Sequence, residues 1–267
     1  MLENISLRSF NCRGLGDGRK RRAIFQWLRN YHSGIVLLQE THSSQLLENQ
    51  WRKEWEGDVY FNHGTNLACG VAILMPKNLV YTVNDQVIDN HGRFLLLDIS
   101  TEDWNMVIIN IYAPTKDHAL EQIDFLESIQ NIIPEYSDKN LVIGGDLNVC
   151  LNPQIDKLGG TLEHQSKYAQ CLEKFCELLN LTDVWRVLHP DSKKFTRRGH
   201  TKSGLVQSRL DYFLISLHMI YDVHSSNIKP GIRSDHSILS VTFNIKNTQQ
   251  RGKGFWKFNV SLLKDKE

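Results

Sequence analysis

Residues 141–149, LVIGGDLNV, join an apolar run to two glycines and then to a carboxylate and an amide. The apolar run predicts a buried strand, and Asp146 and Asn148 stand at its end. One interpretation is a polar strand end followed by a turn, where Asp and Asn bind nearby backbone. The alternative is a catalytic position, because residues two apart in an extended chain face the same side. The ends of the other predicted strands bear on this choice.

The composition of the chain is that of a soluble globular protein. It has 267 residues, of which 41% are hydrophobic and 23% charged. No apolar run approaches the roughly 20 residues of a membrane span, and the N-terminus lacks the pattern of a signal peptide. The five cysteines contain no C-x-x-C pair and indicate reduced thiols in a cytosolic or nuclear protein. We therefore expect no membrane association and no secretion.

Basic residues gather in short runs although the formal net charge is only +1. The runs are Arg19–Arg22, Lys193–Lys194 and Arg197–Arg198. A single such run is usually solvated surface. Several runs beside a catalytic site would suit a polyanionic substrate.

Strand patterns dominate the chain and helical patterns fall between them. Apolar or alternating runs predict strands at 4–10, 35–39, 70–75, 79–88, 93–100, 106–112, 141–144, 209–215 and 237–245. Apolar stripes of helical period predict helices at 20–31, 117–133 and 165–180. Because helices alternate with hairpin-like strand pairs, we expect a pair of mixed sheets with helices outside. Residues 1–245 form the predicted domain, and residues 246–267 resemble the start of a linker.

Polar side chains recur at the ends of these strands. Each has an ordinary explanation when taken singly, such as a turn, a cap or an exposed side chain. Because nearly every buried strand ends this way, we expect one solvent-facing rim that gathers them. The predicted rim contains Glu40, Asp146, Asn148, Asp211, Asp235 and His236.

Four carboxylates on one rim indicate a bound cation. They would repel one another unless a cation offsets their charge. Oxygen ligands suit Mg²⁺ or Mn²⁺, whereas zinc favours more His or Cys. A hard cation, a carboxylate that orients water and a His–Asp pair are the parts needed for phosphoester hydrolysis.

The motifs in their order resemble the endonuclease/exonuclease/phosphatase superfamily. They are N-x-R-G-L, Q-E-T, I-Y-A-P, G-G-D-L-N, S-R-L-D-Y and S-D-H, and together they span residues 5–245. Within that superfamily the chain is most similar to the apurinic-type endonuclease domain of LINE (non-LTR) retrotransposons. Three stretches support this similarity: QETH at 39–42, VQSRLDY at 206–212, and FWKFN at 255–259 followed by SLL at 261–263.

The resemblance implies the fold and the metal site. The expected fold is a four-layered α/β sandwich of the DNase type, with two mixed β-sheets packed face to face and helices outside. Glu40 would hold a divalent metal, with Asn11 close by. Asp235 would lie beside the metal or the leaving group. The expected metal is Mg²⁺, with Mn²⁺ able to replace it.

The resemblance also implies catalytic roles. Asp146 would orient or deprotonate the attacking water, and Asn148 would align that water and the phosphate. Tyr112 would contact the scissile phosphate. Asp211 would pair with His236, which would donate to a phosphate oxygen.

Further matching positions are expected to bind the substrate. Thr196 and Ser234 match family positions near the phosphate. The segment 197–204 matches a hairpin that enters a DNA groove and tunes site choice, although an exposed loop with incidental basic residues is the ordinary alternative. The complete expected substrate set is Thr196, Arg197, Arg198, His200, Lys202, Ser208, Arg209 and Ser234.

Two positions depart from the family pattern. Repair-type apurinic endonucleases usually have an acidic residue two after the first Asn, where this chain has Arg13. This difference disfavours a repair enzyme and a second metal site there. The F-T-W pattern of the retrotransposon enzymes is Phe195-Thr196-Arg197 here, so a cationic contact would replace an aromatic one.

The sequence thus predicts a metal-dependent endonuclease that nicks one strand of duplex DNA. It would leave a 3′-hydroxyl and a 5′-phosphate, and the 3′-hydroxyl would prime reverse transcription of the element's RNA. The expected partners are target DNA, the element RNA and a reverse transcriptase, with synthesis in the cytoplasm and action in the nucleus. The alternatives are an abasic-site repair endonuclease, a phosphatase or phosphodiesterase of small molecules, and a non-catalytic nucleic-acid-binding relative.

Overall fold

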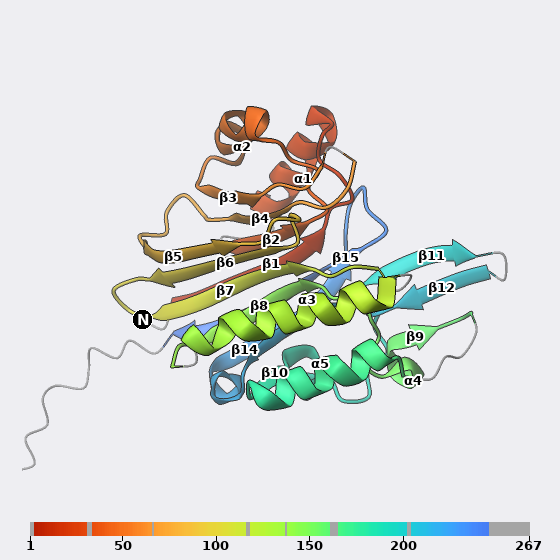
Figure 1. Cartoon of the computed structure of the whole chain (residues 1–267). Coiled ribbons are helices and arrows are strands. Elements are labelled where there is room, and N and C mark those ends of the chain that lie inside the picture. The colour runs from red at the N-terminus through yellow and green to blue at the C-terminus, as the bar shows by residue number, and fades with distance from the viewer. Residues whose placement is uncertain are drawn as a thin grey trace, which may run out of the picture.

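The computed structural model describes residues 3–30, 34–65, 67–115, 118–136, 138–160, 165–201 and 204–245. These residues form two six-stranded sheets, packed face to face, and a small third sheet (Figure 1). The expected linker at 246–267 lies outside the described residues, as does Lys202.

The first sheet has the strand order β14-β15-β1-β2-β4-β3. Strand β1, the first in the chain, pairs antiparallel with β15, the last in the chain, and parallel with β2. The strands are β1 (Glu3–Asn11), β2 (Ile35–Gln39), β3 (Val59–Asn62), β4 (Val71–Leu74), β14 (Val223–Pro230) and β15 (Ser237–Ile245).

The second sheet has the strand order β10-β13-β8-β7-β6-β5. Here β7 and β8 are parallel, and the other pairs are antiparallel. The strands are β5 (Thr82–Ile88), β6 (Phe94–Ser100), β7 (Asn105–Tyr112), β8 (Leu141–Asp146), β10 (Leu181–Asp183) and β13 (Asp211–Ser216). The third sheet joins β11 (Arg197–Thr201), β12 (Gly204–Ser208) and β9 (Lys157–Leu158).

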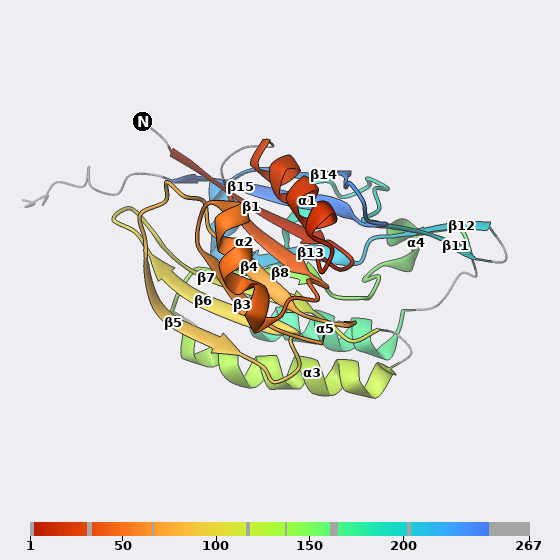
Figure 2. The ribbon, with the colours of Figure 1, turned by 90° about the horizontal axis from the view of Figure 1, so that it is seen from above.

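Helices cover the outer face of each large sheet, which confirms the predicted four-layered sandwich (Figures 1 and 2). The helices α1 (Gly18–Asn30) and α2 (Glu48–Trp55) pack on the first sheet, and α3 (Ala119–Ile132) and α5 (Lys167–Leu178) pack on the second. Shorter helices are α4 (Pro153–Asp156) and α6 (Val184–Leu188), with 3-10 turns at Gln45–Leu47, Ile133–Tyr136 and Leu217–Asp222. No helix in the described part of the chain is both long enough and apolar enough to span a membrane.

Burial on both faces explains the apolar runs of the central strands. In β2, Ile35 and Leu37 point into the core between the sheets, whereas Val36 and Leu38 pack under α1 and α2. A strand covered on both faces gains from apolar side chains at every position. This is why the central strands were predictable from continuous apolar sequence.

Polar side chains join the two sheets beside the site. The Nε2 of Gln39, at the end of β2, donates to the Oδ1 of Asn110 in β7 at 2.7 Å. The Nδ2 of Asn110 in turn donates to the carbonyl oxygens of Leu38 and Ala72 at 3.0 and 2.9 Å. Gln39 and Asn110 are fully buried, so these bonds fix one sheet relative to the other in a dry interior.

Candidate active site at one end of the sandwich

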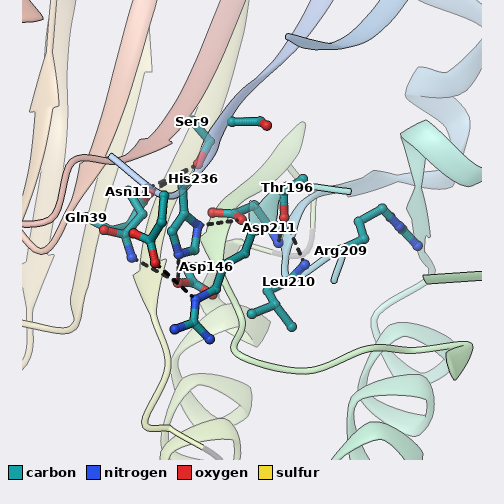
Figure 3. Close-up of polar contacts among 12 residues, drawn as sticks. Ser9, Asn11, Gln39, Asp146, Thr196, Arg209, Leu210, Asp211 and His236 are labelled. Atoms are coloured by element: carbon teal, nitrogen blue, oxygen red, sulfur yellow. Dashed lines mark hydrogen bonds and ion pairs between the residues drawn. The ribbon is translucent and has the colours of Figure 1, made fainter. Parts of the chain in front are cut away.

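The topology brings the polar strand ends to one end of the sandwich. The parallel pairs place Asn11 opposite Gln39, which precedes Glu40, and Tyr112 opposite Asp146. Antiparallel β13 starts at this same end, so Asp211 pairs with Asp146. His236 lies directly before β15, which also starts there. The register thus brings these strand ends together, and Figure 3 shows Asn11, Asp146, Asp211 and His236 beside one another.

His236, Asp211 and Asp146 form the centre of the site. The Nδ1 of His236 lies 2.9 Å from the Oδ2 of Asp211, and its Nε2 lies 3.8 Å from the Oδ2 of Asp146. The exposed fraction is 5% for His236, 0% for Asp211 and 1% for Asp146. The prediction of a solvent-facing rim is therefore wrong for these three residues, which lie below the surface in contact with Asn11, Thr196 and Arg197 of neighbouring segments.

Burial and mutual charge shift the pKa values of this group. Burial raises the pKa of Asp146 to about 7, and the negative charge of Asp211 acts in the same direction. Burial disfavours the charged form of His236, but the charge of Asp211 and its hydrogen bond outweigh this and raise the pKa of His236 to about 9. At neutral pH, His236 is a cation held by Asp211 and aimed at Asp146.

Asn11 connects this group to Glu40. Its Nδ2 donates to Glu40 Oε1 at 2.8 Å and to Asp146 Oδ2 at 2.9 Å. Its Oδ1 accepts from the backbone N–H of Arg13 at 3.1 Å. One amide group therefore spans a carboxylate from each sheet.

Glu40 occupies a tight loop that turns its carboxylate toward the site. Its φ of 50° is left-handed, and neighbouring loops fix it through the bonds Gly14 N to Glu40 O at 2.7 Å and Thr41 N to Gly70 O at 2.9 Å. The pKa of the buried Tyr112 phenol is raised by burial, and also by the charge of Glu40 and a hydrogen bond to it. Tyr112 therefore keeps its proton and acts as a donor here.

The donor atoms fit a hard divalent cation at Glu40 better than at His236. His236, Asp211 and Asp146 place possible ligand atoms within 4.8 Å of one another. However, the pKa of His236 is raised by Asp211, so a metal would have to displace the ring proton that Asp211 stabilises. Glu40 is only half-buried and offers carboxylate oxygen next to Asn11 and Asp146, which is the donor chemistry that Mg²⁺ prefers.

Asn148 lies in a turn after β8 and not in the strand, which differs from the prediction. Strand β8 ends at Asp146, and Asn148 has a left-handed φ of 51°, so the two-residue period of a strand does not apply. Its backbone N–H donates to Asp146 Oδ1 at 2.9 Å, and its Nδ2 donates to Ala113 O at 2.8 Å. Asn148 therefore orients the Asp146 carboxylate through a turn.

Two residues that were expected to contact the substrate instead form hydrogen bonds with the protein backbone. The hydroxyl of the fully buried Thr196 accepts from the N–H groups of Leu210 and Asp211 at 2.9 and 3.1 Å. The hydroxyl of Ser234 donates to Asn11 O at 2.8 Å and accepts from the His236 N–H at 3.1 Å. In this arrangement both residues position the catalytic strand ends.

Arg209 is also placed differently from the expectation. It is 1% exposed, and Figure 3 shows it extending away from His236. Its Nε and Nη2 donate to the buried Asp156 at 2.7 and 3.0 Å, and its Nη1 lies 2.7 Å from Asp183. The prediction that Arg209 contacts substrate is wrong, because internal carboxylates take its guanidinium.

The hairpin of β11 and β12 projects from the sandwich, as Figure 2 shows, and its first residue, Arg197, forms a bridge with His236. Arg197, Arg198 and His200 are exposed on it, and Ser208 is half-buried at its base. A groove of about 860 Å³ lies between the hairpin, Asn148 and the start of α5. Lysines and further polar groups line it, including Lys157, Ser166, Lys167, Arg197 and His200.

Asp235 lies at the outer edge of the site. Its two carboxylate oxygens lie within 4 Å of the guanidinium groups of Arg13 and Arg197. Its negative charge also contributes to the raised pKa of His236. Sequence reasoning missed the contact between Arg13 and Asp235, and no local pattern could have found it, because the two residues lie far apart in the chain.

Residues 9–236 match the model of the Endonuclease/Exonuclease/phosphatase family. The chain is 31% identical over 266 residues to the "Transposon TX1 uncharacterized 149 kDa protein" of Xenopus laevis. The aligned region covers 98% of this chain and 20% of that protein. It thus spans about a fifth of the length of this relative. It is also 23% identical over 261 residues to the "Exodeoxyribonuclease" of Bacillus subtilis (strain 168), covering 90% of this chain and 100% of that protein.

Solved structures share the fold. The AP endonuclease LMAP from Leishmania major matches with a TM-score of 0.78 at 16% identity, over 90% of this chain and 88% of that one. The APE2 catalytic domain of Xenopus laevis matches with a TM-score of 0.72 at 19% identity, over 91% and 94% of the two chains.

Proposed function

The chain belongs to the endonuclease/exonuclease/phosphatase family, and from this membership we propose that it is a divalent-metal-dependent endonuclease that nicks one strand of duplex DNA. The observation that supports this best is the buried group of Asp146, His236 and Asp211, joined through Asn11 to Glu40. This arrangement combines a proton acceptor, a proton donor and an anionic metal site in one place.

In the proposed reaction, Asp146 accepts a proton from the attacking water. Its pKa of about 7 suits a general base near neutral pH, and the N–H groups of Asn11 and Asn148 hold its carboxylate in one orientation. The Nε2–H of His236 donates to an oxygen of the scissile phosphate, while Asp211 keeps the imidazole oriented and charged. Tyr112 donates to the same phosphate.

Glu40 is the proposed metal ligand, with Asn11 beside it and Asp235 farther out near the leaving group. Bound Mg²⁺, or Mn²⁺ in its place, supplies positive charge that polarises the phosphoryl oxygen and offsets charge on the leaving oxygen. Thr196 and Ser234 position Asp211 and His236 through the backbone.

The DNA would lie across the site and along the hairpin. Arg197, Arg198 and His200 are exposed on the hairpin, and Lys157 and Lys167 line the groove beside it. Such cations would contact phosphates and position the duplex without specifying its sequence. The hairpin would then choose where along the DNA the nick is made, and Ser208 at its base would belong to the same surface.

We further propose that the nick serves a LINE-type retrotransposon. The 31% identity to a transposon protein over 98% of this chain supports this role. The cut would leave a 3′-hydroxyl that primes reverse transcription of the element's RNA, which requires a reverse transcriptase as partner. The reaction would take place in the nucleus after synthesis in the cytoplasm.

Nicking of supercoiled plasmid tests the activity. We expect relaxed circles with Mg²⁺ or Mn²⁺, no product with EDTA, and none from the Asp146→Asn variant, whose side chain keeps its size but not its basicity. Direct sealing of the nicks by DNA ligase would show 3′-hydroxyl and 5′-phosphate ends. A plasmid that stays supercoiled at enzyme excess with Mg²⁺ contradicts the proposal.

A matched pair of duplexes separates this function from abasic-site repair. One duplex is intact, and the other has a single abasic site at a defined position. We expect nicks in the intact duplex at a rate equal to or above that in the abasic one. Cleavage confined to the abasic site would favour the repair function.

A further inference from the structure

Two arginines from distant segments flank one carboxylate at the edge of the site. The Nη1 of Arg13, in the loop after β1, lies 3.6 Å from Asp235 Oδ1, and the Nε of Arg197, in β11, lies 3.4 Å from Asp235 Oδ2. The two arginine side chains are 66% and 50% exposed. Resting on the endonuclease function above, we propose that Arg13 binds a backbone phosphate of the DNA next to the nick, with Arg197 as its partner and Asp235 as the group that orients both.

The backbone at Arg13 supports a functional role for its side chain. Arg13 has a φ of 49°, a left-handed conformation that favours Gly or Asn and is uncommon for a long side chain. Its N–H donates to Asn11 Oδ1 at 3.1 Å, and its carbonyl oxygen accepts from Lys20 Nζ at 2.7 Å. The surrounding contacts thus hold an unfavourable conformation and give the Arg13 side chain a defined origin.

The three residues border the catalytic group through direct bonds. The backbone of Arg13 is bonded to Asn11, whose amide contacts both Glu40 and Asp146. The strand residue Arg197 forms an isolated bridge with His236, and the Arg198 N–H donates to Asp235 O at 3.0 Å. A phosphate bound by Arg13 and Arg197 would therefore belong to the nucleotide adjoining the scissile bond.

The charges favour a phosphate over the internal carboxylate. Two guanidinium groups face one carboxylate, so the cluster has a net positive charge of one before DNA binds. Guanidinium groups match phosphate oxygens with paired hydrogen bonds, which are stronger than the longer contacts with Asp235. An exposed ion pair contributes little stability, so its exchange for a phosphate costs little. Asp235 thus holds both guanidinium groups in place until a phosphate binds them.

Steady-state nicking at several salt concentrations tests Arg13. For Arg13→Gln we expect KM for intact duplex to rise about tenfold at low salt, as for a lost charged hydrogen bond. We expect kcat to stay within about twofold, and the slope of log KM against log salt to fall by about one, the signature of one lost phosphate contact. Arg13→Lys should keep the slope and part of the affinity.

The matched control is Lys77→Gln, which removes one positive charge at the opposite end of the sandwich. Lys77 is exposed and follows β4, whose first residue, Val71, pairs with Gln39 near the site. This variant should keep both KM and slope. An unchanged slope for Arg13→Gln, or a fall in kcat at constant KM, overturns the phosphate contact and leaves Arg13 with a structural role.

Binding of a fluorescent duplex without divalent metal distinguishes this inference from the proposed activity. If the parent binds duplex here but does not nick it once Mg²⁺ is added, the endonuclease function fails, and Arg13 is still judged by the salt slope of binding. A slope lowered by about one in Arg13→Gln supports the contact, and an equal slope refutes it. If the parent does not bind duplex, both proposals fail.

Discussion

At the scale of the residue, the proposed reaction depends on two titrating groups, Asp146 and His236, that face each other in a buried space. Asp146 must be ionised to accept a proton, and His236 must be protonated to donate one. The pKa of Asp146 is raised to about 7 and that of His236 to about 9. Because the groups interact, the limbs of a pH profile report on the group as a whole.

The nicking rate should therefore fall on both sides of this range. Below about pH 7 the carboxylate of Asp146 gains a proton, and above about pH 9 the imidazolium of His236 loses one. Asp211 raises both pKa values, so in Asp211→Asn both limbs should move to lower pH. The residual single-turnover rate across pH checks this, and limbs that stay in place contradict it.

Residue types at strand ends were enough to predict which side chains converge, but not how deeply they lie. Sequence shows Asp211 and His236 as polar residues beside apolar strands, and exposure is the ordinary inference for such residues. Their burial follows from loops contributed by other parts of the chain. The internal ion pairs of Arg209 were not predictable either, because its partners Asp156 and Asp183 lie in short segments without a sequence pattern.

At the scale of the element, the ion pairs around Asp156 anchor the short helix α4 to the start of β13. Asp156 is fully buried and accepts from Arg209 at 2.7 and 3.0 Å and from Arg186 at 2.6 Å. Asp156→Asn leaves the buried Arg209 poorly compensated. We expect the free energy of unfolding to fall by about 3–5 kcal/mol.

Urea denaturation followed by circular dichroism measures this loss. Asp191→Asn makes the same chemical change at an exposed position and should stay within about 0.5 kcal/mol of the parent. A loss below about 1 kcal/mol for Asp156→Asn would mean that the Arg209 pairing contributes little to stability.

The hairpin of β11 and β12 should act on the place of cutting more than on its rate. Its exposed cations stand beside the site, whereas the catalytic group lies below the surface. We expect exchange of residues 198–204 for a Gly-Ser turn to redistribute nicks along a long duplex, with the rate changed much less. Sequencing the nick positions checks this, and the same exchange at residues 76–79, at the opposite end, serves as control. An unaltered nick pattern would contradict the role in site choice.

Elements were predictable where burial imposes a regular pattern. Continuous apolar runs predicted the central strands, and apolar stripes predicted α1, α3 and α5. Helix α2 and strand β14 were missed, because α2 has the short polar sequence ENQWRKEW and β14 is an edge strand, VHSSNIKP, with mostly polar residues. Tertiary contacts specify such elements more than their own composition does.

At the scale of the whole molecule, the proposed metal site lies where the two sheets meet. Glu40 follows β2 of the first sheet, and Asp146 ends β8 of the second. A cation bound at Glu40, next to this junction of the sheets, should stabilise the folded state. At ten times its dissociation constant, Mg²⁺ adds about 1.4 kcal/mol, which corresponds to a rise in Tm of roughly 3–6 °C.

Thermal unfolding with and without Mg²⁺ measures this effect independently of activity. Glu40→Gln should lose most of the rise because the amide is neutral. Glu56→Gln, a similar change at the exposed residue that caps the end of α2, should keep it. If Mg²⁺ raised the Tm of Glu40→Gln as much as that of the parent, the cation would bind at another site.

The pairing of β1 with β15 also bears on when the protein becomes active during its synthesis. Asn11 is translated before His236 and β15, which come at the other end of the described domain. A nascent chain still missing β15 has neither its proton donor nor the neighbour that β1 requires. Under the proposed mechanism an unfinished polypeptide is therefore unable to cut nucleic acid, and cutting begins only after β15 has been translated and has paired with β1.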